Sequence, residues 1–506
     1  MAAETQGRPH ETAMRHDHAF WRAFARNVRD NIAGETAVQA LRLGATVALA
    51  RALTPGDFGL FRILLIVSAF ATLFTEAGIP DALIQRDELR PEHESTAFWL
   101  TTGFGALVAG ALYAGAPVIA RLMAMPQLTE SARLLCFPIL LGATAVTSDA
   151  RLRRELRFGA LAVADVLGEI GFIAAAFWIL ALGMPLWSLP AGLAARLALR
   201  AATLWAADAR LPRTAPSVRA AGDFARFAST VCGAKLITSL SSNADYVLVG
   251  RMLGSSALGF YSIAWDLLRF VPDRLHRVAG RVTFPAFCRL RGEDRRLATA
   301  YRDFFGYLAR IVPAFALCAA ILAPELLATV YGHKWIPAAL PMRLLAAGLM
   351  LFGLEVGIGS VYYATDHPSY DIYLHTGRLA LIAAAIFSLS AEGLPGVCAG
   401  MSAVETLVSV TGLGLACAAA GLDAHELLEA ALPGFKVAIL CGIAAFAARF
   451  LALAAGLDAP AVLAVTSVAA MLVYLQVERS NVGAMLSAAL GRDPRPNVAA
   501  AARQDG

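Results

Sequence analysis

The chain of 506 residues is a succession of long apolar runs separated by short segments that hold charged residues, Gly or Pro. A helix crosses the ~30 Å hydrocarbon layer of a bilayer with about 20 residues. Runs of that length predict an all-α polytopic membrane protein with fourteen transmembrane helices. The predicted helices are residues 31–53, 57–83, 95–120, 130–150, 158–182, 185–207, 223–253, 257–285, 300–323, 337–363, 369–390, 393–420, 433–456 and 459–478.

The composition agrees with a surface that faces lipid. Hydrophobic residues make up 58% of the chain and charged residues only 16%, whereas a soluble domain has about 25% charged residues. The seven cysteines are scattered singly, without a C-x-x-C pair or a nearby His at metal-ligand spacing. We therefore expect no metal, no cofactor and no nucleic-acid partner.

Basic residues, nearly all Arg, concentrate in alternate loops between the apolar runs. The positive-inside rule places these loops, and with them both termini, in the cytoplasm. The Arg-rich loops contain Arg86, Arg90, Arg151, Arg153, Arg154, Arg157, Arg210, Arg213, Arg219, Arg289, Arg291, Arg295 and Arg296. Loops on the opposite side are short, which weighs against a membrane glycosyltransferase or polymerase because such enzymes usually hold their acceptor in a sizeable outer loop.

Two polar terminal segments flank the predicted membrane domain. Residues 1–30 form a cytoplasmic tail in which aromatic residues alternate with Arg from Phe20 to Arg29, a pattern that predicts an interfacial amphipathic helix. Residues 479–506 form a second cytoplasmic tail. No cleavable signal peptide is expected, because residues 1–30 carry both charge signs.

An internal repeat relates two halves of the chain at an offset of 200 residues: VALARALTPGDFGLF (47–61) and VLVGRMLGSSALGFY (247–261). Matched pairs are Arg51 with Arg251, Leu53 with Leu253, Gly59 with Gly259 and Phe61 with Tyr261. We predict two pseudo-symmetric six-helix lobes that enter the membrane in the same direction, with a substrate path between them. The predicted parts are an N-lobe (31–207), a cytoplasmic linker (208–222), a C-lobe (223–421) and two further helices (422–478).

Polar stripes lie at equivalent places in the two repeats. The first holds Glu35, Gln39, Arg42 and Thr46, and the second holds Lys235, Ser239, Ser242 and Tyr246. Because polar groups facing lipid are costly, both stripes are expected to face the protein interior or a wet cavity. A cationic cavity would suit an anionic substrate. The candidate substrate-binding residues are Arg42, Gln39, Lys235, Ser239 and Arg269.

Acidic residues inside the predicted spans are candidates for binding a coupling proton or cation. Asp165 and Glu169 lie one turn apart, but structural pairing with Arg196 or Arg200 explains them equally well. The candidate coupling residues are Asp165, Glu169, Asp245 and Asp266. An ion pair of Asp266 with Arg269 is the alternative there. The chain has no G-x-x-x-x-G-K-[ST] loop, so ATP-driven transport within it and other enzyme chemistry are not expected.

The segment ALARALTPGDFGLFRILLIVSAFATLFTEAGIPDALIQR (48–86) resembles the signature of the polysaccharide transporter branch of the MOP flippase superfamily. The matching positions are Arg51, Leu53, Pro55, Asp57, Phe58, Gly59, Gly78, Ala82, Leu83, Ile84 and Gln85. At the junction between the first two predicted helices, Pro55 would fix the φ angle of the turn and Asp57 would cap the helix 57–83. Gly59 would permit close packing of that helix.

This resemblance implies a Wzx-type flippase of the bacterial cytoplasmic membrane. Such a protein moves undecaprenyl-diphosphate-linked oligosaccharide repeat units to the periplasmic leaflet for exopolysaccharide, capsule or O-antigen synthesis. It implies alternating access around a central cavity, with a polysaccharide polymerase and chain-length machinery as partners. A multidrug antiporter of the same superfamily usually has twelve spans, and a lipid II flippase has fourteen; the P-x-D-F-G turn favours the polysaccharide branch.

Overall fold

The computed structural model describes residues 34–86, 89–210, 214–292 and 294–479. The predicted tail at 1–30 and all but the first residue of the tail at 479–506 lie outside these ranges, so the interfacial helix stays a prediction. Every regular element of the described residues is a helix. The first described helix covers residues 34–52. The others are α2 (Pro55–Glu76), α3 (Ile79–Gln85), α4 (Pro91–Met123), α5 (Leu128–Leu134), α6 (Cys136–Arg154), α7 (Phe158–Ala181), α8 (Pro185–Ala207), α9 (Val218–Arg289), α10 (Asp294–Ile321), α11 (Ala323–Val330), η1 (His333–Ala338), α12 (Ala339–Phe352), α13 (Ile358–Ala364), α14 (Ser369–Leu389), η2 (Ser390–Glu392), α15 (Gly393–Ala420), α16 (Ala424–Ala454) and α17 (Ala459–Val477).

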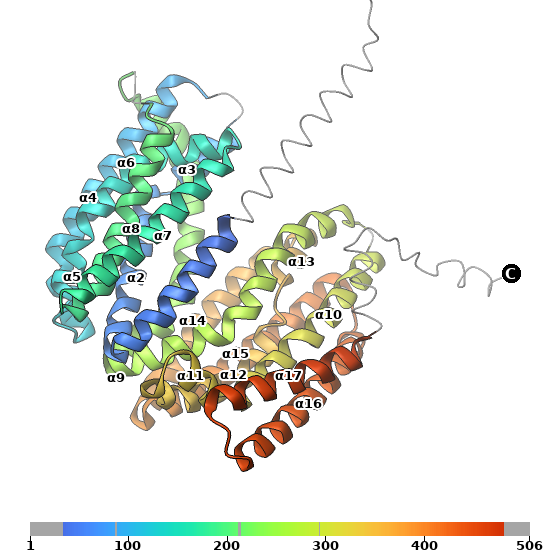
Figure 1. Cartoon of the computed structure of the whole chain (residues 1–506). Coiled ribbons are helices and arrows are strands. Elements are labelled where there is room, and N and C mark those ends of the chain that lie inside the picture. The colour runs from blue at the N-terminus through green and yellow to red at the C-terminus, as the bar shows by residue number, and fades with distance from the viewer. Residues whose placement is uncertain (1–33, 87–88, 211–213, 293, 480–506) are drawn as a thin grey trace, which may run out of the picture. The chain divides into compact units, whose positions relative to one another are not determined.

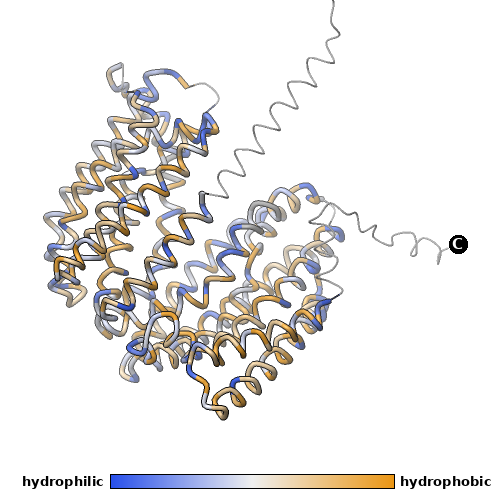
Figure 2. The backbone as a smooth tube through the Cα atoms, in the orientation of Figure 1, coloured by the Kyte–Doolittle hydropathy of each residue, from blue (hydrophilic) through white to orange (hydrophobic). Residues whose placement is uncertain are grey.

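The helices have the length and composition of membrane spans. Among the described residues, ten helices are long and apolar enough to cross a bilayer. Two of the ten, Val231–Arg277 with 47 residues and Ser369–Ala420 with 52, are each long enough for two crossings of about 20 residues. Hydrophobic positions follow the helices, and hydrophilic positions gather toward their ends (Figure 2). The prediction of an all-α polytopic membrane protein is confirmed, and the number fourteen stays a prediction.

The start of α2 follows directly from its sequence. Thr54 is the N-cap, and its hydroxyl accepts a hydrogen bond from the Asp57 backbone N–H at 3.3 Å. In return the Asp57 carboxylate accepts one from the Thr54 backbone N–H at 2.9 Å, which completes a capping box. Pro55 lies in the first turn of α2. A backbone N–H at this position would have no carbonyl acceptor within the helix, so its absence in Pro costs nothing. The cap is therefore Thr54, and Asp57 supports it from the third helical position.

Several predicted helices are interrupted where the backbone leaves the helical region. Ala77 and Gly78, with φ of 45° and 76°, separate α2 from α3 inside the predicted span 57–83. The predicted span 130–150 is divided into α5 and α6, and the span 337–363 into η1, α12 and α13. In α9 only Gly254, with φ 85° and ψ 176°, interrupts the helix between the two predicted spans. These breaks depend on single residues, which an average over 20 apolar positions does not detect.

The chain divides into two compact units, Met1–Ser262 and Ile263–Gly506. In the first unit α7 packs along α8, and α4 and α8 pack along α6. In the second unit α10 packs along α16, α16 along α17, and α12 and α14 along α15 (Figure 1). The division falls inside α9, so by its contacts the segment Val218–Ser262 belongs with the first unit. The predicted lobe boundaries remain a prediction.

The two copies of the sequence repeat meet each other within the first unit. A Cβ atom built on Gly59 would lie 1.8 Å from the carbonyl oxygen of Ser255. A Cβ atom on Gly259 would lie 1.9 Å from the carbonyl oxygen of Pro55. Gly59 corresponds to Gly259, and Pro55 to Ser255, at the offset of 200. The contact is therefore reciprocal: because each glycine lacks a side chain, the backbone of the other repeat can lie directly against it. Two equivalent segments that cross on a local two-fold axis have this arrangement.

Candidate functional site

Two of the predicted site residues form one ion pair in the first unit. Arg42 donates from Nη2 to Oε2 of Glu169 at 3.1 Å, and Nη1 of Arg196 lies 3.7 Å from the same oxygen. The Glu169 side chain is 1% exposed, whereas that of Arg42 is 47% exposed. Two guanidinium groups thus share one buried carboxylate, which leaves a net positive charge on this cluster. Gln39 is half-buried on the same helix as Arg42.

Asp165 belongs to a second chain of ion pairs. Arg200 donates from Nε to Asp165 at 2.7 Å and from Nη2 to Asp149 at 3.0 Å. Arg153 donates from Nε to the other oxygen of Asp149 at 2.6 Å. The chain joins α6, α7 and α8 and has equal numbers of positive and negative groups. The pairing of Asp165 with Arg200 and of Glu169 with Arg196 is the structural alternative to a coupling role.

Among the described contacts, Lys235 of the second polar stripe is not part of the ion-pair cluster of Arg42. Its Nζ lies 2.5 Å from Oδ2 of Asp81 on α3, and both side chains are about half exposed. Ser239 lies one turn further along α9 and is half-buried. Asp245 is buried and accepts a hydrogen bond of 2.7 Å from the hydroxyl of Tyr261. Lys235 therefore has a carboxylate partner from the same unit, as Arg42 does.

The remaining predicted residues lie in the second unit. Arg269 donates to Asp273 at 3.4 Å, one turn along α9, and its guanidinium lies 5.5 Å from the centre of the Phe352 ring. An acid one turn C-terminal to Arg269 is therefore one of its partners. The ion pair of Arg269 with Asp266, the alternative offered by the sequence, stays a prediction, and the Asp266 side chain is exposed.

A buried polar centre of the second unit surrounds the break between α12 and α13. Glu355 lies in this break and accepts a hydrogen bond of 2.5 Å from the hydroxyl of Ser409 on α15. Nearby, Nη2 of Arg378 on α14 lies 2.5 Å from Oε1 of Glu405 on α15. The Glu405 side chain is 1% exposed. These pairs satisfy charges that would otherwise be costly in the apolar interior, and they join α14 to α15.

The end of the first unit that holds the Arg-rich loops is tied to the start of α9. Arg86 donates from Nη2 to Oδ2 of Asp223 at 2.9 Å, and Nε2 of His93 lies 3.5 Å from the same oxygen. Hydrogen bonding from Arg86 holds the pKa of Asp223 below its ordinary value of 3.8. Beside this contact Phe224 packs into a buried cluster with Leu83. Charge and apolar contact together dock α9 against α3 and α4.

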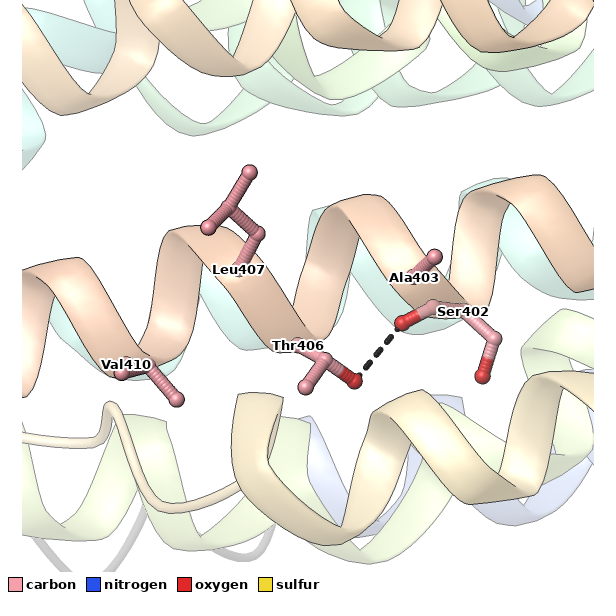
Figure 3. Close-up of a pocket in the computed structure, with 5 residues that line it drawn as sticks. All are labelled: Ser402, Ala403, Thr406, Leu407 and Val410. Atoms are coloured by element: carbon pink, nitrogen blue, oxygen red, sulfur yellow. Dashed lines mark hydrogen bonds between the residues drawn. The ribbon is translucent and has the colours of Figure 1, made fainter.

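Two hollows differ in chemical character. One, of about 130 Å³, lies between α2, α6 and α8 and is lined in part by Glu76, Asp149, Arg153 and Arg200. The other, of about 470 Å³, is lined by five residues of α15, from Ser402 to Val410, and none of the five is charged (Figure 3). Figure 3 draws one hydrogen bond there, from the Thr406 hydroxyl to the backbone carbonyl of Ser402. The first hollow is the polar one.

Neither Asp149 nor Glu76 was among the residues predicted from the sequence to form the site. Asp149 and Arg153 are four residues apart on one helix, a spacing that indicates a pair on one helical face. For Glu76 the signal was Gly78, two residues later, which is the N-cap of α3 and marks the break that follows α2. In the described ranges, no group of three or more His, Cys, Asp or Glu side chains is arranged to hold a metal ion.

Comparison with known proteins places this architecture in a family. A family model described as polysaccharide biosynthesis protein matches residues 48–340, more than half of the chain. The chain belongs to this polysaccharide biosynthesis protein family. The matched range begins within the first described helix, and it includes residues 48–61 of the first copy of the internal repeat and all of the second copy.

Relatives with named roles span most of the chain. Teichuronic acid biosynthesis protein TuaB of Bacillus subtilis is 24% identical, over 81% of this chain and 85% of that protein. Lipopolysaccharide biosynthesis protein WzxC of Escherichia coli is 23% identical, over 73% and 76%. Succinoglycan biosynthesis transport protein ExoT of Rhizobium meliloti is 26% identical, over 64% and 66%. These names concern different polysaccharides, so the family relation leaves the glycan open.

Solved structures share the fold. Lipid II flippase MurJ in an inward closed conformation superposes with a TM-score of 0.68 at 12% identity, over 90% of this chain and all of that one. An inward-facing multidrug resistance MATE transporter of the MOP superfamily gives 0.64 at 15% identity, over 76% and 94%. At these identities the likeness concerns the fold. The resemblance of residues 48–86 to a polysaccharide family is confirmed by the family model, and the chain shares the fold of MOP superfamily transporters. The family member is a multi-pass membrane protein.

Proposed function

We propose that this chain is a flippase that moves undecaprenyl-diphosphate-linked oligosaccharide repeat units from the cytoplasmic to the periplasmic leaflet. It does so by alternating access in the bacterial cytoplasmic membrane, with both termini in the cytoplasm. The product feeds exopolysaccharide, capsule or O-antigen synthesis, where a polymerase and chain-length machinery consume it. The observation that carries the proposal is the set of relatives named for polysaccharide biosynthesis, one of which, ExoT, is named a transport protein. The fold shared with a lipid II flippase supports it.

The charges inside the first unit support an anionic substrate. The cluster of Arg42, Arg196 and Glu169 holds two positive groups against one negative group, and the Arg42 side chain is 47% exposed. A diphosphate that approached Arg42 would meet a guanidinium with charge left over after its pairing with Glu169. Arg binds phosphate oxygens through charge-assisted hydrogen bonds that a fork of N–H donors can make in pairs. Arg42 is therefore the residue of this set that we assign to the headgroup.

Membrane potential supplies a driving force in the proposed direction. The cytoplasm is negative, so each negative charge of a headgroup that moves outward gains about 2.3 kcal/mol per 100 mV. Collapse of the potential in proteoliposomes should therefore slow flipping. A flipping rate that does not respond to the potential would contradict a direct electrical contribution and would leave ion exchange or consumption of the product as the source of energy.

The function is tested by deleting the gene and analysing the lipid-linked intermediates of the cell. We expect undecaprenyl-linked oligosaccharide to accumulate in the cytoplasmic leaflet, inaccessible to an impermeant glycan-modifying reagent from outside. Mass spectrometry of the accumulated lipid would identify the repeat unit. Normal polysaccharide and no accumulated intermediate in the deletion strain would overturn the proposal.

Complementation tests the assignment of Arg42. The variant Arg42→Ala should restore export poorly at an unchanged amount of protein in the membrane. The matched control is Arg121→Ala, because Arg121 is exposed at the end of α4. In the part of the chain that the structure describes, it bonds only within its own helix, donating to the Pro117 carbonyl at 3.3 Å. Full export by Arg42→Ala would show that Arg42 does not bind the substrate headgroup. The flippase function itself would then be decided by the deletion experiment.

A further inference from the structure

The pocket between α2, α6 and α8 contains polar groups of two kinds. Asp149, Arg153 and Arg200 are engaged in the chain of ion pairs described above. Thr75 and Glu76 at the end of α2 line the same pocket. The Thr75 hydroxyl is buried and has no hydrogen-bond partner among the described residues. A volume of about 130 Å³ exceeds what one water needs, so polar atoms in this wall can be hydrated.

Glu76 differs from the other carboxylates of this pocket. Asp149 contacts two guanidinium groups, at 2.6 and 3.0 Å. Among the residues that the structure describes, Glu76 has no hydrogen bond to its side chain and no ion pair, although it is half-buried. Removing a carboxylate from water without a donor or a cation beside it is costly, and protonation removes that cost.

The charges around Glu76 cancel one another. The charged groups that face it are Asp149 on α6, Arg200 on α8, Lys235 on α9 and Asp81 on α3. Two are positive and two are negative, and Lys235 and Asp81 pair directly at 2.5 Å. Arg153 and Asp165 extend the ion chain by one charge of each sign. The surroundings are therefore neutral, and the charge of Glu76 is the one that stays uncompensated in this neighbourhood.

We propose that Glu76 is a proton-binding site of the first unit and that water in the adjoining pocket delivers the proton. A single proton makes the whole neighbourhood neutral, which suits the apolar surroundings at the end of α2. A metal cation fits less well, since in the described ranges no cluster of three or more ligating side chains is present. The candidate coupling residues Asp165 and Glu169 have Arg partners, so Glu76 replaces them as the proton carrier.

Proton binding is tested on the full chain in nanodiscs without substrate. Infrared difference spectra between buffers of about pH 6 and pH 9, both above the ordinary glutamate pKa of about 4.3, report the carbonyl band of a carboxyl group that is still protonated where exposed carboxylates are ionised. Glu76→Gln should lose the signal of about one carboxyl group relative to the unchanged protein. Glu76→Asp should keep a band, since it retains the carboxyl group. The matched control Glu426→Gln, at an exposed residue in the first turn of α16, should match the unchanged protein.

Two outcomes would overturn the assignment. An unaltered difference spectrum in Glu76→Gln means that another group titrates. Loss of the band when Na⁺ replaces K⁺ at constant pH means that the pocket takes up a metal cation instead of a proton. If Glu76→Gln does not fold, the comparison of Glu76→Asp with the unchanged protein decides, because the shorter acid should shift the band and a different titrating group would leave it in place.

A role for this proton in transport rests on the proposed flippase function. In proteoliposomes an imposed pH gradient should change the flipping rate of the unchanged protein and of Glu426→Gln, whereas Glu76→Gln should lose this response. A full response in Glu76→Gln would overturn the coupling role. Failure of the unchanged protein to flip the lipid would instead count against the proposed function, and the infrared result would stand by itself.

Discussion

The reciprocal contact between the two repeats predicts a large effect of a very small substitution. In Gly59→Ala the new Cβ atom would lie 1.8 Å from the carbonyl oxygen of Ser255. Carbon and oxygen atoms that are not bonded approach to about 3.3 Å, so the two backbones must separate by about 1.5 Å. The obstacle is backbone, which cannot rotate away as a side chain can. Overpacking usually costs about 1–3 kcal/mol of unfolding free energy, and we expect the upper end of this range.

The measurement is thermal and denaturant unfolding of the purified protein in detergent, followed by tryptophan fluorescence. Gly103→Ala is the matched control, because a Cβ atom on Gly103 of α4 meets nothing within 4 Å. It should be neutral or slightly stabilising, since Ala is favoured over Gly in a helix by about 1 kcal/mol. A Gly59→Ala protein as stable as this control would show that the two repeats do not make the close crossing.

The double variant Gly59→Ala, Gly259→Ala is a sharper test. Both added methyl groups widen the same crossing, so the separation forced by the first already makes room for the second. The loss of stability should therefore be smaller than the sum of the two single losses, by about 0.5–3 kcal/mol as for other contacting residues. Losses that simply add would refute the reasoning, because they would mean that the two glycines lie at independent contacts.

Two further predictions concern charge pairs of the first unit. Glu169→Gln should lower the unfolding free energy by about 3 kcal/mol, because Arg42 and Arg196 lose their shared buried partner; adding Arg42→Gln should restore part of the loss, and a further decrease would contradict this pairing. Asp223 has a pKa below its ordinary 3.8 because Arg86 donates to it, so its stabilising contribution is present above that value and is lost as the pH falls through the lowered pKa. Asp223→Asn should accordingly unfold at a lower temperature than the unchanged protein at neutral pH and at the same temperature in strong acid, and a difference that persists in acid would show another cause.

Local features of the sequence were sufficient for the class of fold. The apolar runs required a lipid environment because too few polar residues remain to cover a water-facing surface. The turn before α2 was also readable, since Pro55 and Asp57 act within four residues of each other. The sequence analysis expected Asp57 to cap the helix, whereas the N-cap is Thr54. The offset of 200 residues identified Gly59 and Gly259 as equivalent positions.

The sequence offered Arg196 and Arg200 as partners of Glu169 and Asp165, but tertiary structure decided the other charge pairs between distant helices. Helical spacing indicated which residues share a face, but the partner of that face depends on how neighbouring helices are rotated and aligned along their axes. Arg42 thus pairs with Glu169, 127 positions away, and Lys235 with Asp81, 154 positions away. The same cause explains Glu76: its sequence context resembles that of other acids near helix ends, and only the packing of α2 against α6 and α8 places it in a neutral, polar pocket without a partner among the described residues.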